Sequence, residues 1–117
     1  MITVDASTKD YTKEVRLKII SSVIDAVKVS AELVTSQAKR FVPVDTGRLR
    51  NAITQSKVEK KGNIIESIVS ANTDYASNVE FGTQKQKAQP YMRPARDTQQ
   101  SAIIDLLSRS VERATKK

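Results

Sequence analysis

The sequence predicts an α+β domain with a long N-terminal helix, a short helix, a small antiparallel β-sheet and a C-terminal helix packed on the sheet. Apolar residues recur at steps of three and four over residues 10–41 and again over residues 94–114, which is the spacing of amphipathic helices. Between them lie two segments of strand-like composition, residues 53–59 and 64–71. At 117 residues the chain makes one domain, and helices over a hairpin with a possible third strand are its simplest arrangement.

The first helix is expected over residues 10–41, after a short lead-in of residues 1–9. Asp10 is suited to be its N-cap or first-turn acid, and no Gly or Pro interrupts the pattern. About 30 residues at 1.5 Å each span about 45 Å, which is more than a small domain covers. We therefore expect part of the apolar stripe to contact another subunit. The stripe consists of Val15, Ile19, Ile20, Val23, Ala26, Val27, Ala31, Val34, Ala38 and Phe41.

The stretch "VPVDTGRLRNAI", residues 42–53, is predicted to end this helix and to begin another. Pro43 disfavours a helical conformation in the residue before it, so the long helix stops there. Asp45 or Thr46 then caps a short second helix that runs to about Ala52.

Two chemical interpretations of this corner have little support. Its Asp-Thr-Gly triplet is similar to the catalytic loop of aspartic proteases, but it follows a helix and occurs once. A phosphate-binding loop needs several glycines and usually a Lys-Ser/Thr pair, and here only Gly47 is present. The structural interpretation is favoured, in which Gly47 permits close approach of the backbone and Arg48 and Arg50 point outward.

The two strand-like segments are expected to pair around "KKGN", residues 60–63. A two-residue turn at Gly62-Asn63 would place Glu59 opposite Glu66, which is a repulsive pair. We therefore expect a four-residue loop, which gives a different set of opposite pairs: Val58 with Ile65, Lys57 with Glu66 and Thr54 with Val69.

The rest of the chain is predicted to form a turn, a loop and a final helix. Residues 71–83 suggest a turn and one helical turn that ends at a glycine. Residues 83–90 are polar and aperiodic, so they form an exposed and mobile loop. Pro94 suits the first turn of the last helix. The apolar stripe of that helix consists of Ala95, Ala102, Ile103, Leu106, Leu107, Val111 and Ala114.

The composition restricts both chemistry and location. The chain has no Cys and no His, which removes disulfides, thiol nucleophiles and the commonest general base and metal ligand. A net charge of +7 suits an acidic partner, yet the basic residues are spread along the sequence. No apolar run approaches the length of a membrane span and no export leader opens the chain, so we expect no membrane partner and a cytoplasmic location during synthesis.

The carboxylates and aromatic residues also point away from catalysis. Asp45, Asp74 and Glu80 lack the spacing of an acid/base pair, and there is no Trp for a sugar platform. We expect Glu80 to pair with an arginine of the Arg93/Arg96 region or of a neighbouring subunit. We interpret the chain as a structural protein, not an enzyme, with no catalytic residue, cofactor or metal site. Core or interface roles are expected for the aromatic residues Tyr75, Phe81 and Tyr91.

Three short clusters follow the long helix in this order: "VPVDTGRLRNAI" (42–53), "YASNVEFGT" (75–83) and "QPYMRPA" (89–95). Together they resemble a family of small tailed-phage and prophage proteins: minor tail components, neck proteins or head–tail joining proteins of phages with long, non-contractile tails. The family patterns are approximately Pro-Val-Asp-Thr-Gly-x-Leu-Arg, Tyr-Ala-x-x-Val-Glu-Phe-Gly-Thr and Gln-Pro-aromatic-x-Arg-Pro-Ala. The matching residues are Pro43 to Gly47, Leu49 and Arg50; Tyr75, Ala76 and Val79 to Thr83; and Gln89 to Tyr91 and Arg93 to Ala95.

The resemblance implies a non-enzymatic virion assembly protein at the head–tail junction, found in the host cytoplasm during assembly. It implies a ring of copies of the chain, about six, that stacks on connector or tail-terminator proteins. Lys85 and Lys87 would order on contact with the next ring or meet DNA phosphates loosely in the channel. A small basic DNA-binding domain is the alternative function. The interface candidates are Asp45, Thr46, Gly47, Arg48, Leu49, Arg50, Tyr75, Glu80, Phe81, Gly82, Thr83, Tyr91 and Arg93.

Overall fold

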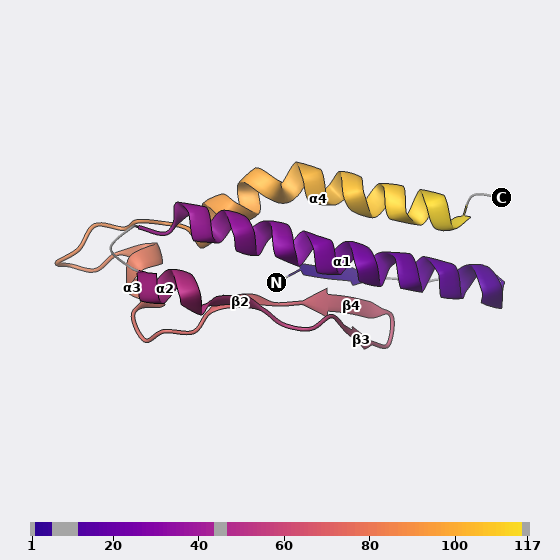
Figure 1. Cartoon of the computed structure of the whole chain (residues 1–117), viewed down its shortest axis with the longest axis horizontal. Coiled ribbons are helices and arrows are strands. Elements are labelled where there is room, and N and C mark those ends of the chain that lie inside the picture. The colour runs from indigo at the N-terminus through magenta and orange to yellow at the C-terminus, as the bar shows by residue number, and fades with distance from the viewer. Residues whose placement is uncertain (1, 6–11, 44–46, 116–117) are drawn as a thin grey trace.

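A computed structural model describes residues 2–5, 12–43 and 47–115 and confirms the α+β class. The molecule is elongated, with extents of 57 × 23 × 21 Å. Helix α1 (Lys13–Phe41) lies in the middle, with α4 (Met92–Thr115) on one side and the strands on the other (Figure 1). The helices α2 (Gly47–Ala52) and α3 (Ala76–Phe81) lie together at one end of the long axis.

Helix α1 begins three residues later than predicted. Its N-cap is Thr12, whose Oγ1 accepts a hydrogen bond from the N–H of Val15 at 3.3 Å. Asp10, the cap expected from the sequence, lies outside the described residues. The helix ends at Phe41, just before Pro43, as the proline predicts.

The apolar stripe of α1 is covered within the chain, which corrects the expectation that part of it would be left for another subunit. Strands pack on one side of α1 and α4 packs on the other, so a helix of this length finds enough surface in a 117-residue chain. Phe41, 40% exposed, is an exception at the end of the stripe. The buried residues of α1 are Ile19, Val23, Ala26, Val27, Ser30, Ala31, Val34 and Ala38.

Helix α4 runs antiparallel to α1, and its apolar stripe is only partly covered. Ala95 and Ala114 are buried near its two ends. Between them, the stripe residue Val111 is 38% exposed. Ile104, which is not one of the residues predicted for the stripe, is 57% exposed. Because α1 separates α4 from most of the sheet, α4 reaches the strands through shared apolar clusters: Leu107 and Ala114 pack in one cluster with Ile65.

The strands form two small antiparallel sheets. Strand β1 (Ile2–Asp5) pairs with β4 (Ile64–Ser67), which also pairs with β3 (Glu59–Lys61). Strand β2 (Ile53–Gln55) pairs with β5 (Val69–Ala71). The segment predicted as a lead-in therefore supplies the third strand of the larger sheet. In the described part of the chain, no helix combines the length and apolarity needed to span a membrane.

The predicted hairpin register is wrong, because a third side chain removes the repulsion on which the prediction rested. The turn is the two-residue Gly62-Asn63 turn, Gly62 has φ +60°, and Glu59 lies opposite Glu66. The ammonium group of Lys61 is 3.5 Å from the carboxylate of Glu59 and 3.3 Å from that of Glu66. The two glutamates thus share a cation, and their contacts raise the pKa of Lys61, with Glu66 the larger contributor.

The register also changes by one residue between the two pairs of strands. Thr54 lies opposite Ser70, not opposite Val69, whereas Lys60 lies opposite Ile65. The transition occurs at Ser56, whose N–H donates to the carbonyl of Ile68 and whose Oγ accepts from the N–H of Ile68, both at 2.8 Å. This local kink replaces the continuous hairpin that the sequence suggested.

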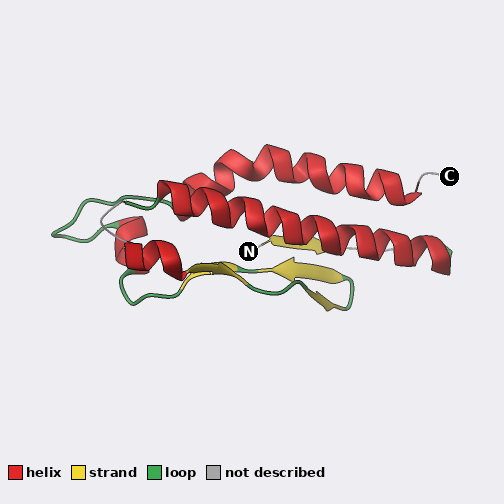
Figure 2. Cartoon of the chain, in the orientation of Figure 1, coloured by secondary structure: helices red, strands yellow, loops and turns green. Residues whose placement is uncertain are grey.

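The end of the molecule that holds α2 and α3 follows the predicted order of elements. Helix α2 spans Gly47–Ala52 as expected, but its predicted caps Asp45 and Thr46 lie outside the described residues. Helix α3 spans Ala76–Phe81 and ends at Gly82. The irregular and largely exposed loop 83–90 then leads into α4 (Figure 2).

Candidate functional site

The three sequence clusters meet in one apolar core at the α2–α3 end of the molecule. This core also receives the C-terminal half of α1 and strand β5, so it joins most elements of the fold. Leu49, one of the predicted interface residues, is fully buried in this core and therefore stabilises the fold. The cluster residues that share the core are Val42, Leu49 and Ile53 from the first, Ala76 and Val79 from the second, and Tyr91 and Ala95 from the third.

Tyr91 connects the second and third clusters from inside this core. Its ring is 2% exposed, and its hydroxyl donates a hydrogen bond to the carbonyl of Ala76 at 3.3 Å. Burial, and to a lesser extent the nearby carboxylate of Glu80, raises the pKa of the phenol above its usual value. Tyr91 therefore stabilises the site in its neutral form and is not free to contact a partner.

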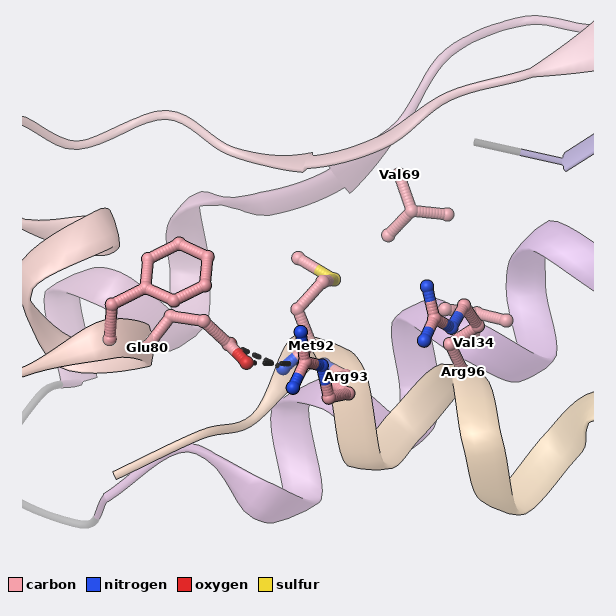
Figure 3. Close-up of a pocket in the computed structure, with 7 residues that line it drawn as sticks. Val34, Val69, Glu80, Met92, Arg93 and Arg96 are labelled. Carbon is pink, nitrogen blue, oxygen red and sulfur yellow. Dashed lines mark hydrogen bonds between the residues drawn. The ribbon is translucent and has the colours of Figure 1, made fainter. Parts of the chain in front are cut away.

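Glu80 holds the start of α4, which corrects the predicted ion pair with Arg93 or Arg96 (Figure 3). Its Oε1 accepts hydrogen bonds from the N–H groups of Tyr91 at 3.1 Å and Met92 at 2.8 Å, and its Oε2 accepts from that of Arg93 at 3.3 Å. The first N–H groups of a helix lack partners within the helix and attract negative charge. A carboxylate from α3 thus caps α4 across 11 to 13 residues of sequence.

Gly82 is required by the path of the loop that follows α3. Its φ is +77°, and a Cβ at this position would lie 2.7 Å from the backbone nitrogen of Ala88 and 3.0 Å from the carbonyl oxygen of Gln86. Thr83 and Gln86 exchange backbone hydrogen bonds at 2.8 and 3.4 Å, and these fold the loop back on itself. The glycine of the Phe-Gly-Thr sequence in the second cluster is therefore needed to form this turn.

The remaining interface candidates lie at the surface. Phe81 is 72% exposed, the largest exposure among the exposed large hydrophobic side chains of the described chain. The guanidinium of Arg48 lies 5.9 Å from the centre of the half-buried Tyr75 ring, a cation–π distance. The other exposed candidates are Gly47, Arg50, Thr83, Lys85, Lys87 and Arg93.

A pocket of about 260 Å³ opens beside these residues, where α3, α4, α1 and β5 meet. Val34, Val69 and Met92 give it an apolar lining, and the side chains of Arg93 and Arg96 lie along the α4 side (Figure 3). Val34, Val69 and Met92 were not candidates from the sequence, because nothing in their spacing brings them together. Their one sequence signal is the position of Met92 inside the third cluster. Arg96 was named only as an expected ion-pair partner of Glu80.

These features define a small α+β protein with an apolar core and exposed basic residues at its α2–α3 end. The chain belongs to the HK97-gp10-like family, whose model is described as "Bacteriophage HK97-gp10, putative tail-component" and matches residues 5–82. The match includes the first cluster and the second as far as Gly82, whereas the third cluster and α4 lie beyond it. The comparisons with curated proteins and with solved structures each gave no match. The family confirms the resemblance to phage tail components and implies a place in the virion among other phage structural proteins.

Proposed function

We propose that the protein is a non-enzymatic structural component of the head–tail junction, where it forms or joins a homo-oligomeric ring. Membership of a tail-component family supports a role in virion structure. Several motif residues support it further, because they serve a core, a helix cap and a turn.

The observation that carries the ring proposal is the exposed apolar face of α4. Ile104 and Val111 are seven residues apart, so they lie on the same side of the helix. Both are substantially exposed, at 57% and 38%. Beside Ile104, a groove of about 490 Å³ runs between α4 and β1 and is lined by Ile103, Leu107 and Thr3.

An elongated subunit that leaves such a side face uncovered gains stability when a neighbour packs against it. Removing apolar surface from water contributes about 25 cal/mol per Å². A side-to-side contact that repeats between neighbours is therefore stabilised once more when the ring closes. A contact between two different faces of neighbouring copies generates such a ring when the rotation closes. We propose that the α4 face is one of these two faces.

The test is the mass of the protein in solution by light scattering after size exclusion, at high and low concentration, with negative-stain images of the largest species. We expect closed rings for the wild type and smaller species for Ile104→Asp. Ala102→Asp is the matched control, because it adds the same charge to an exposed position on the opposite side of α4. Rings that persist in Ile104→Asp would rule out the α4 face as the ring contact.

A further inference from the structure

The fold gathers basic side chains at the α2–α3 end although they are spread along the sequence. Arg48 and Arg50 come from α2, Lys85 and Lys87 from the loop, and Arg93 and Arg96 from the first turns of α4 (Figure 1). All six are exposed. Within the described chain, Arg96 alone among them has a carboxylate partner, Asp97 at 3.2 Å.

Glu80, an acidic group at this end and beside the pocket, is already engaged. Both carboxylate oxygens of Glu80 accept N–H groups at the start of α4, so its charge is directed into the helix terminus. The pocket beside it is therefore bordered by two outward cations, Arg93 and Arg96, over an apolar lining. Phe81 extends this apolar surface outward, since it lines the pocket and is 72% exposed.

We propose that this arginine-bordered pocket docks an acidic segment of another virion protein, with one apolar side chain in the pocket and carboxylates on the surrounding cations. The inference rests on the proposed function, because it assumes a protein neighbour in the virion. Charge complementarity selects a different protein over a second copy: the chain carries +7 overall, and basic residues outnumber acidic ones outside this end as well.

The apolar part of the pocket favours a protein over duplex DNA. Phosphates would satisfy the cations but would leave the exposed ring of Phe81 and the apolar mouth of the pocket in contact with water. A peptide that brings both an apolar anchor and carboxylates matches both parts of the surface, and Arg offers planar, bidentate contacts to each carboxylate.

The experiment measures binding of labelled peptides to the full chain by fluorescence anisotropy at low and at physiological salt. The probe has one leucine flanked on each side by three glutamates, and a second peptide has glycine in place of the leucine. We expect the leucine peptide to bind at least tenfold more tightly than the glycine peptide. Arg93→Gln with Arg96→Gln should weaken binding of the leucine peptide at least tenfold. Phe81→Ser should weaken it as much, and because Phe81 is largely exposed this substitution should leave the fold intact.

Matched controls separate this pocket from general electrostatics and from ring formation. Lys13→Gln with Arg16→Gln removes the same charge from exposed positions at the far end of α1, and it should leave the affinity within twofold. Ile104→Asp should also bind normally, so failure of the ring and failure of the pocket are distinguishable. The inference is overturned if neither peptide binds, if both bind equally, or if a 20-base-pair DNA duplex binds more tightly than the leucine peptide.

Discussion

The cap that Glu80 provides to α4 gives a quantitative prediction for stability. The carboxylate accepts three backbone N–H groups at 2.8 to 3.3 Å and is half-buried. Loss of a helix N-cap costs about 1 kcal/mol and at most about 2, and hydrogen bonds to a charged group contribute about 1.5–3 kcal/mol. Because solvent reaches the group, we take the lower part of this range. We expect Glu80→Ala to cost about 2 kcal/mol and Glu80→Gln, which keeps one acceptor oxygen, about 1 kcal/mol.

The assay is urea denaturation at pH 7, followed by circular dichroism, with thermal melts in parallel. A loss of 1 kcal/mol corresponds to a decrease of about 5 °C in Tm for a domain of this size. Glu32→Gln is the matched control, because Glu32 is an exposed acid in the interior of α1. Hydrogen exchange should also show earlier opening of the first turn of α4 in both Glu80 variants. If both unfold at the same urea concentration as Glu32→Gln, the cap does not stabilise the fold and the reasoning is refuted.

Three further changes test other parts of the structure. Gly82→Ala places a Cβ 2.7 Å from the backbone nitrogen of Ala88 at φ +77°, and we expect a loss of about 1–3 kcal/mol in denaturant; an unchanged midpoint would contradict the close approach. The raised pKa of Tyr91 means that its neutral form is favoured by folding, so this stabilisation is present below the usual pKa near 10 and is lost as pH rises through the higher folded value. Tyr91→Phe should therefore flatten the alkaline decrease in stability, and an unaltered pH profile would exclude Tyr91 as its source. Lys61→Met leaves two facing glutamates without their shared cation, and we expect faster hydrogen exchange in the β3–β4 turn, more so at low salt; wild-type exchange rates would show that the cation is unnecessary.

The element order was predictable because local signals determine it. The end of α1 follows from Pro43, and the start of α4 follows from the apolar spacing and Pro94. The register of β3 and β4 was not predictable from opposite pairs alone. Two glutamates face each other, and the deciding contact comes from Lys61, a residue outside that pair.

The surface was less predictable than the fold because its key contacts are long-range. Glu80 was expected to pair with an arginine, but its partners are backbone N–H groups at the start of α4, which carry no signal in the sequence. The uncovered stripe was expected on α1 and is found on α4, since periodicity shows that a helix has an apolar face but not which element covers it. Helix α2 and the loop 83–90 are far apart in sequence, and only the fold brings them to one end of the molecule (Figure 1).

The most direct test of the proposed position is immunogold labelling of intact particles of the phage that encodes this chain, with an antibody against the protein. We expect gold at the head–tail junction, in a single cluster on each particle. Gold at the tail tip or along the tail tube would contradict the junction while leaving the tail-component family intact. Particles without gold, together with protein found only in the lysate, would contradict a structural role in the virion.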